Sequence, residues 1–177
     1  MSEIDRMDPG QESQPWSIHR VGVVGMGLIG GSIALDLTQQ GVEVQGLVHR
    51  EVTAERARSR GLAPLVSTDP SCLQDCDLVI LALPLESLLT PEESLLNALP
   101  EQAVVTDVGS VKAEVLAVWR DLHPRFVGSH PMAGTAQAGV DAGLPGLFCG
   151  RPWVSTPEST TDPAALEVIH QLAVRLG

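Results

Sequence analysis

The stretch that decides the fold is VGVVGMGLIGGS, residues 21–32, in which a short apolar run leads through glycines into a helical pattern. The helical pattern continues to residue 40 and stops at Gly41, where a C-terminal glycine cap belongs. Further along, DLVILAL at residues 77–83 is apolar throughout, which is typical of a parallel strand buried on both faces. Strand and helix patterns alternate along the rest of the chain. We therefore predict an α/β fold of the Rossmann type, a doubly wound and mostly parallel sheet with helices on both faces.

The glycines after the first strand form the pattern G-x-G-x-x-G, which in this strand–turn–helix context indicates a dinucleotide site. The first glycine permits a tight turn, the second lets the backbone approach a pyrophosphate, and the third allows close packing of helix and strand. The free N–H groups at the start of the helix favour the phosphates. The alternative is a glycine-rich turn without a ligand. The predicted cofactor contacts here are Gly25, Gly27, Leu28, Ile29 and Gly30.

The end of the second predicted strand indicates which dinucleotide is preferred. An acidic residue at this position accepts hydrogen bonds from the ribose 2'-hydroxyl, whereas a basic one accommodates a 2'-phosphate. The chain reads LVHR, with His49 and Arg50 at the strand end and no acidic residue before Glu51. Arg50 offers a guanidinium fork suited to phosphate, and His49 adds a donor. We therefore predict NADP in preference to NAD; the alternative is an exposed loop with incidental basic residues.

Composition excludes several classes of partner. The 22 acidic residues against 11 basic ones give a formal charge of −11, which disfavours nucleic acids and anionic membranes. No apolar run approaches the roughly 20 residues of a membrane-spanning helix. Three cysteines form no disulfide framework, and Cys72 with Cys76 lacks the further ligands of a zinc site. We expect a small-molecule ligand, no metal, no membrane and no nucleic acid, and a cytoplasmic location.

The domain organisation follows from the same patterns. Residues 1–17 are acidic and contain no apolar segment, so we expect a disordered tail without a targeting signal. Residues 18–177 are then one dinucleotide-binding domain.

Two later motifs lie at predicted strand ends, where the ligand crevice of such a fold is found. They are TDVGSVK at residues 106–112 and GSHPMAGT at residues 128–135. Together with the glycine motif and the LALP at the end of the buried strand, they closely resemble the amino-terminal domain of prephenate and arogenate dehydrogenases, enzymes of tyrosine biosynthesis. The resemblance covers residues 21–177. It implies an oxidoreductase in which a nicotinamide cofactor takes a hydride from the ring carbon bearing the hydroxyl while the ring carboxylate leaves as carbon dioxide.

The resemblance also implies roles for single residues. His130 matches the catalytic histidine, which accepts the hydroxyl proton as the hydride departs. Ser110 matches the serine that bonds to this histidine and to the substrate hydroxyl, and Gly134 and Thr135 match a loop near the substrate. The alternatives are that His130 only bonds a loop carbonyl and that Ser110 caps a helix starting at Val111, which is compatible with its catalytic role.

Two charged residues of the TDVGSVK motif are assigned no catalytic role. We expect Asp107 to be a structural group at the end of its strand. Lys112 lies past Ser110 on a predicted helix, where we expect it to be solvated; the alternative is that it helps to hold the cofactor.

Members of the family that this sequence resembles continue into a helical domain that makes a homodimer and supplies an arginine for a substrate carboxylate. The 177 residues contain no counterpart of this carboxyl-terminal domain. Two classes of function remain: a dehydrogenase, and a stand-alone NADP-binding module without turnover. A third alternative is a different Rossmann-type oxidoreductase that acts on hydroxy acids or imines. This alternative does not explain why TDVGSVK is followed by GSHPMAGT. The NADP-type strand end resembles the arogenate-using members and favours arogenate over prephenate.

Overall fold

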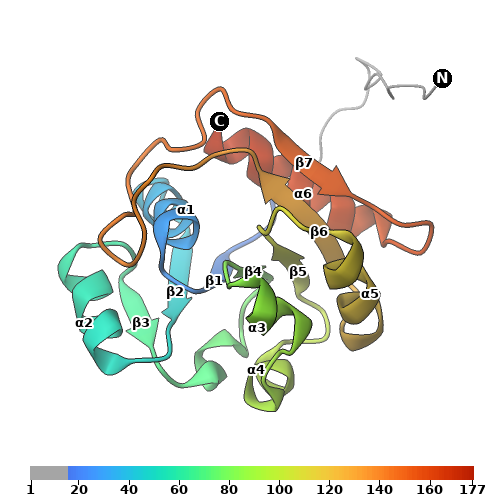
Figure 1. The fold of residues 1–177 in the computed structure, drawn as a ribbon, viewed down its shortest axis with the longest axis horizontal. Coiled ribbons are helices and arrows are strands. Elements are labelled where there is room, and N and C mark those ends of the chain that lie inside the picture. The colour runs from blue at the N-terminus through green and yellow to red at the C-terminus, as the bar shows by residue number, and fades with distance from the viewer. Residues whose placement is uncertain (1–15) are drawn as a thin grey trace.

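A computed structural model describes residues 16–177 (Figure 1). The strands are β1 (Arg20–Val24), β2 (Glu43–Leu47), β3 (Leu65–Ser67), β4 (Leu78–Leu81), β5 (Val104–Asp107), β6 (Phe126–Pro131) and β7 (Trp153–Thr156). The helices are α1 (Leu28–Gln39), α2 (Glu51–Ser59), α3 (Leu85–Leu89), α4 (Glu93–Ala98), α5 (Ala113–Leu122) and α6 (Pro163–Leu176), with a 3₁₀ helix, η1 (Pro70–Leu73).

The expected tail, residues 1–17, lies almost entirely outside the described residues. Trp16, at its end, is half-buried and packs against the hydrophobic core. The guanidinium of Arg175 lies 5.1 Å from the centre of the Trp16 ring. The folded part of the chain therefore includes Trp16. Removal of its indole ring from water stabilises the fold.

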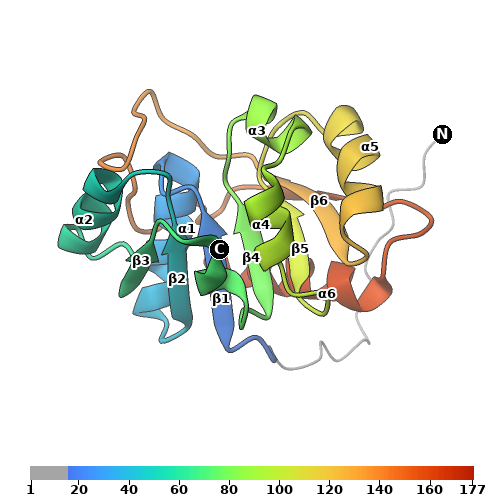
Figure 2. The same cartoon turned by 90° about the horizontal axis from the view of Figure 1, so that it is seen from below.

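The strands form one sheet in the order β3-β2-β1-β4-β5-β6-β7. Figure 2 shows the strands from β3 to β6 side by side in this order. Every neighbouring pair is parallel except β6 and β7, which are antiparallel. The predicted doubly wound, mostly parallel sheet is confirmed. The chain leaves β1 toward β2 on one side and returns through β4 on the other, and this reversal opens a crevice at the carboxyl ends of the strands.

Alternating residues of each strand supply two separate hydrophobic cores. In β4, Leu78 and Ile80 point to one face of the sheet while Val79 and Leu81 point to the other, and all four are fully buried. Residues of α1, α2 and α6 complete the first core, and residues of η1, α3, α4 and α5 complete the second. Helices on both faces, and the continuous apolar run of β4, follow from this double burial.

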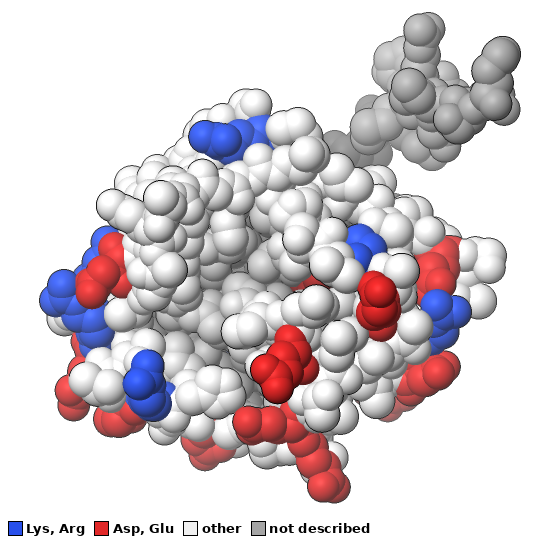
Figure 3. Space-filling view, viewed as in Figure 1, with Lys and Arg blue, Asp and Glu red and all other residues white. Residues whose placement is uncertain are grey.

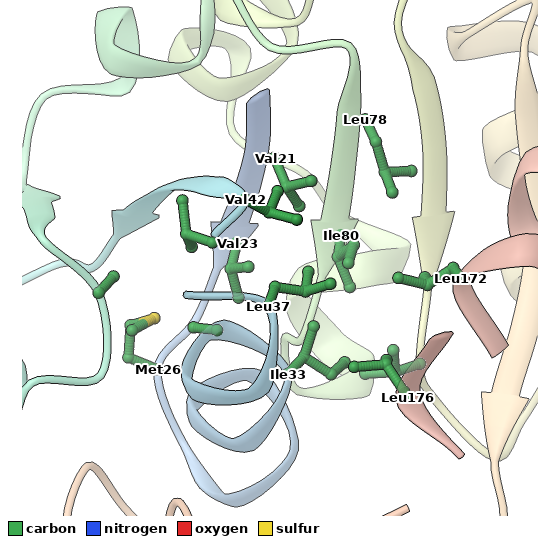
Figure 4. Packing of buried hydrophobic residues seen from close by; sticks show 14 of the residues in the cluster. Val21, Val23, Met26, Ile33, Leu37, Val42, Leu78, Ile80, Leu172 and Leu176 are labelled. Carbon is green, nitrogen blue, oxygen red and sulfur yellow. The ribbon is translucent and has the colours of Figure 1, made fainter. Parts of the chain in front are cut away.

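The first core fixes the position of α1 against the sheet. Figure 4 shows Ile33 and Leu37 of α1 pointing toward the strands and toward Leu172 and Leu176 of α6. Both α1 side chains are completely buried, and burial of each contributes roughly 1.5–3 kcal/mol. The helix ends as predicted, with Gly41 at a φ of 79°, a conformation that glycine adopts without a steric penalty. The start of α1 is thereby held at the crevice.

A buried histidine links α5 to the sheet. His123 follows α5, and its Nε2 lies 3.0 Å from the carbonyl oxygen of Pro100, while its Nδ1 lies 3.3 Å from the N–H of Arg125. A carbonyl only accepts and a backbone N–H only donates, so the ring is neutral with its proton on Nε2. Burial lowers the pKa of His123 below its usual value of 6.5.

This pairing predicts a loss of stability in mild acid. Below about pH 6.5 the unfolded chain takes up a proton on His123 that the folded chain resists, so the free energy of unfolding decreases as the pH falls. We expect this decrease between pH 7.5 and pH 5.5 (roughly the range spanned by an ordinary imidazole) to be smaller in His123→Gln than in the wild type. Urea unfolding at both pH values measures it. His19→Gln, at an exposed histidine, should keep the wild-type dependence, and equal slopes in all three proteins would contradict the assignment.

Candidate active site

A cleft of about 1180 Å³ opens at the carboxyl ends of the strands, where the strand order reverses. Figure 3 shows a hollow in the middle of this face, with acidic residues over the α3–α4 side and basic residues together with acidic ones over the α2 side. All seven residues predicted to contact the cofactor line the cleft, namely Gly25, Gly27, Leu28, Ile29, Gly30, His49 and Arg50.

The three glycines of the motif differ in the space that surrounds them, as the position of an added Cβ atom shows. Gly25 has a φ of 90°, and a Cβ there would lie 2.3 Å from the carbonyl oxygen of Ala82. A Cβ on Gly30 would lie only 1.9 Å from the carbonyl oxygen of Gly25. A Cβ on Gly27 would meet no atom within 4 Å. Gly25 and Gly30 are therefore required by the packing of turn, strand and helix, whereas Gly27 leaves open space for a ligand.

The start of α1 has the properties of an anion site. Gly27 is the N-cap residue and makes no side-chain cap, and the first turn contains no acidic residue. Among the described residues, the N–H groups of Leu28, Ile29 and Gly30 have no backbone acceptor. They carry the positive end of the helix dipole, which favours phosphate oxygens. The site therefore fits a dinucleotide pyrophosphate: its N–H donors are free, Gly27 leaves open space, and these residues line the cleft.

The end of β2 presents basic side chains at the rim of the cleft. Arg50 is the N-cap residue of α2, is exposed, and its side chain makes no ion pair with any described residue. Glu51, its acidic neighbour, is instead paired with Arg58. The Nδ1 of His49 lies 4.0 Å from a carboxylate oxygen of Glu92, and both side chains are well exposed. Arg50 is thus free to bind an anion, while Glu92 adds a negative charge that sequence reasoning did not place here.

One wall of the cleft comes from the long connection between β6 and β7, in residues 137–141. Arg60 donates to the carbonyl oxygen of Val140 at 2.7 Å, and Arg56 forms an ion pair with Asp141 at 2.7 Å. These bonds tie the wall to α2. Sequence reasoning missed this wall because a glycine-rich segment has no hydrophobic period, although the basic residues at the end of α2 and the acidic residue in the loop were visible.

His130 lies on β6 next to the cleft. Its Nδ1 is 3.0 Å from the carbonyl oxygen of Val108, a residue that lines the cleft. Because a carbonyl only accepts, Nδ1 carries the proton of the neutral ring and Nε2 has a free lone pair. Nε2 makes no hydrogen bond to another described residue. The bond to a loop carbonyl is present, and it leaves the other nitrogen available as a base.

The other residues implied by the family resemblance lie outside the cleft lining. Ser110 is exposed and makes no hydrogen bond to His130 in this structure. The alternative that Ser110 caps a helix starting at Val111 is wrong, because α5 starts at Ala113 and its N-cap residue is Lys112. Gly134 and Thr135 are exposed in the segment leading to the cleft wall, where the Thr135 hydroxyl accepts from the N–H of Gln137 at 3.2 Å.

Lys112 is not solvated, contrary to the expectation from its position in the sequence. Its side chain is 15% exposed and forms an ion pair with Asp107, which is completely buried. It also donates to the carbonyl oxygen of Ser129 at 2.8 Å. Burial raises the pKa of the Asp107 carboxyl and lowers that of the Lys112 ammonium, and each charge offsets the shift of the other. Asp107 is the structural strand-end group that was predicted, with Lys112 as its partner.

The described part of the chain offers no metal site, no reactive thiol at Cys76 and no membrane-spanning helix. Residues 16–177 contain no group of three or more His, Cys, Asp or Glu side chains able to hold a metal ion. Burial raises the pKa of the Cys76 thiol to about 12, so it remains protonated. No helix within this range is both long enough and apolar enough to cross a membrane.

The parallel sheet, the glycine turn and the free start of α1 define a Rossmann-type dinucleotide-binding domain. The family model described as "Prephenate dehydrogenase, nucleotide-binding domain" matches residues 33–177. The chain therefore belongs to the prephenate dehydrogenase family and represents its nucleotide-binding domain.

Individual relatives agree with this assignment. The chain is 32% identical to cyclohexadienyl dehydrogenase of Zymomonas mobilis, over 89% of this chain and 55% of that protein. The structure of Synechocystis arogenate dehydrogenase superposes with a TM-score of 0.85 at 38% identity, over 89% of this chain and 57% of the other. The structure of prephenate dehydrogenase of A. aeolicus, in complex with hydroxyphenyl propionate and NAD+, superposes with a TM-score of 0.85 at 30% identity. This match covers 93% of this chain and 59% of the other. The chain spans about half the length of the curated relatives it matches.

The glycine geometry predicts opposite effects of two alanine substitutions. Gly27→Ala adds a methyl group where nothing lies within 4 Å, so we expect the unfolding temperature of the free chain to change little but its rise with NADP+ to be lost. Gly30→Ala creates a clash, and overpacking of this kind costs about 1–3 kcal/mol or more. Thermal unfolding with and without NADP+ compares them. A Gly30→Ala protein as stable as the wild type would show that the close approach of α1 is not required.

Proposed function

We propose that this chain binds NADP and supplies the catalytic base of a dehydrogenase that oxidatively decarboxylates arogenate, with prephenate as the alternative substrate. The observation that carries the proposal is the arrangement at His130. Its Nδ1 donates to the carbonyl of Val108, beside the nucleotide cleft, and its Nε2 is left free. The names of the relatives support the substrate class, since they include arogenate, prephenate and cyclohexadienyl dehydrogenases.

The proposed chemistry places one proton transfer on this chain. When bound, the cofactor supplies a nicotinamide ring that accepts the hydride from the hydroxyl-bearing ring carbon. The Nε2 of His130 takes the proton of that hydroxyl, and the Val108 carbonyl stabilises the imidazolium that results. The ring carboxylate leaves as carbon dioxide, and the substrate ring becomes aromatic. Ser110 is proposed to bond to the substrate hydroxyl, for which its exposed hydroxyl is available.

NADP is proposed over NAD on the charges at the end of β2. Arg50 lines the cleft without an acidic partner among the described residues, because Glu51 is paired with Arg58. A guanidinium binds a 2'-phosphate through charge-assisted hydrogen bonds. Glu92 beside His49 opposes this preference but is well exposed, so solvent weakens its repulsion. The A. aeolicus relative was solved with NAD+, so membership of the family does not decide the cofactor.

The second candidate is a stand-alone NADP-binding module without turnover. It is favoured by one observation: the residues proposed to contact the cofactor line the cleft, whereas His130, Ser110, Gly134 and Thr135 do not. In the enzyme proposal, the substrate side of the pocket and a homodimer contact come from a helical domain of the kind that the family resemblance implies. A wild-type protein that carries this chain together with such a helical domain, and that binds NADP+ but turns over neither arogenate nor prephenate, would support the module.

Replacement of the base tests the enzyme proposal. In a protein that also carries the family's helical domain, we expect His130→Asn to lower kcat by roughly 10²–10⁴-fold, the usual contribution of a general base. The Kd for NADP+ should stay within about twofold, since His130 does not line the cleft. Steady-state NADPH formation and a binding titration measure the two quantities. His19→Asn is the matched control at an exposed histidine. Wild-type turnover in His130→Asn would remove His130 from the mechanism.

Charge reversal at the end of β2 tests the cofactor proposal. We expect Arg50→Asp to weaken NADP+ binding by at least roughly tenfold, because one hydrogen bond to a charged group contributes about 1.5–3 kcal/mol. NAD+ binding should be unchanged or stronger, since the new carboxylate can accept from the ribose 2'-hydroxyl. Titration of the protein with each nucleotide gives the ratio of the dissociation constants for NADP+ and NAD+. Arg151→Asp makes the same charge change at an exposed residue outside the cleft lining, and an Arg50→Asp ratio equal to that of this control would argue against an NADP-reading role.

A further inference from the structure

The hydrogen-bond ladder between β5 and β6 stops just before His130. Its last paired residues are Asp107 and Gly128. β6 nevertheless continues to Pro131, paired on its other side with β7, where His130 lies opposite Val154. The side of β6 that faces β5 therefore needs other partners for its last residues, because buried backbone groups without a hydrogen bond cost stability.

Three side chains continue the connection where the ladder stops. The Ser129 hydroxyl donates to the carbonyl oxygen of Asp107 at 3.1 Å. The Lys112 ammonium donates to the carbonyl oxygen of Ser129 at 2.8 Å, and His130 donates to the carbonyl oxygen of Val108 at 3.0 Å. The contact that orients the imidazole is thus one member of a set that joins the two strand ends.

Lys112 is the central member of this set. It is the only lysine among the 177 residues, and its ammonium bridges the buried carboxylate of Asp107 and the backbone of Ser129, the residue before His130. The same carboxylate oxygen of Asp107 accepts from the N–H of Gly109 at 2.9 Å. The ion pair therefore holds the backbone on both sides of the bond between His130 and Val108.

The geometry of this pair does not indicate a role in stability alone. Replacing a buried ion pair by apolar residues of similar volume is often neutral or stabilising, so such a pair is weak evidence for stability. The second carboxylate oxygen of Asp107 is buried without a hydrogen-bond partner, which costs further stability. An apolar pair, however, cannot donate to the Ser129 carbonyl or accept from Gly109. What the ion pair supplies is a fixed distance between the end of β6 and the loop after β5.

We propose that Lys112 and Asp107 are positioning residues for His130, holding the Val108 carbonyl where it accepts from Nδ1 and so keeping the imidazole in the tautomer whose Nε2 is the base. This inference rests on the proposed function of His130. Neither residue lines the cleft, so both act through the histidine and not on the cofactor or substrate directly.

The tautomer of His130 is the direct test, and it needs neither substrate nor cofactor. Long-range ¹H–¹⁵N spectra of the chain labelled with ¹⁵N-histidine distinguish Nδ1–H from Nε2–H rings, and the loss of one of five signals in His130→Asn assigns the resonance. In the wild type we expect a single Nδ1–H form. In Lys112→Met we expect loss of this single form and a mixture of both tautomers. An Nε2–H ring in the wild type would overturn the proposal without any variant.

Two further variants separate positioning from folding. Lys112→Met alone leaves the Asp107 charge buried and unpaired, so it can fail to fold. The double variant Asp107→Asn/Lys112→Met removes both charges while Asn keeps an acceptor for Gly109, and it should fold and still show mixed tautomers. Arg120→Met removes a cation from the same helix, where Arg120 pairs with Glu158 at 3.0 Å near the surface, and should keep the wild-type tautomer.

The outcomes distinguish this inference from the proposed function. A folded double variant with an unchanged Nδ1–H ring at His130 overturns the positioning role, whatever the activity. Loss of the single tautomer in the double variant, with NADP+ affinity unchanged, supports it. If His130→Asn retained wild-type turnover while the tautomer responded to Lys112 as expected, the proposed function would fail and the structural coupling would stand.

Discussion

The nucleotide side of the molecule depends on the close contact between α1 and the turn after β1. At Gly30 a methyl group would lie 1.9 Å from the carbonyl oxygen of Gly25 and 2.8 Å from the side chain of Ala82, so the helix packs where only a hydrogen atom fits. This contact brings the first N–H groups of α1 to the point where the strand order reverses. The same helix carries Ser32 and Asp36, which accept from the long connection between β6 and β7. The position of one cleft wall therefore also depends on the glycine contact.

The nucleotide-binding residues and the proposed base are built from different strands, and Val108 links them. The glycine turn and the end of β2 belong to one half of the sheet, whereas His130 lies on β6 in the other half. Val108 lines the nucleotide cleft, and its carbonyl accepts from His130. The proposed base is thus placed with respect to the cleft by covalent geometry and one hydrogen bond. Such pre-organisation lowers the entropic cost of bringing base and substrate together.

Local patterns in the sequence carried most of the fold and the nucleotide side of the site. The glycine motif, the apolar run of β4 and the cap at Gly41 each report on neighbours within a few residues, and the structure confirms the fold that they predict. Strand β3 and helix η1 were not predicted, because they are too short to show a period. The cleft wall at residues 137–141 was missed for a related reason: its place depends on arginines distant in the sequence. Lys112 was expected in solvent because the sequence shows Asp107 five residues earlier but does not show that this carboxylate is buried and pairs with the lysine.

The start of α1 and the end of the pairing between β5 and β6 share a physical feature: regular backbone hydrogen bonding stops at both places. The ladder between β5 and β6 ends at Asp107, and the backbone bonds of α1 begin only after its first residues. At one place the free donors are open to a ligand, as at Leu28. At the other, backbone carbonyl oxygens accept from side chains: that of Ser129 accepts from Lys112, and that of Val108 accepts from His130. Where β6 continues beyond its pairing with β5, side chains take over the connection. One of them is the imidazole of His130, which donates to the Val108 carbonyl in the loop after β5 and makes no hydrogen bond through its second nitrogen to another described residue. The incomplete ladder is thus a structural reason for an oriented imidazole at this edge of the sheet, independent of any resemblance in sequence.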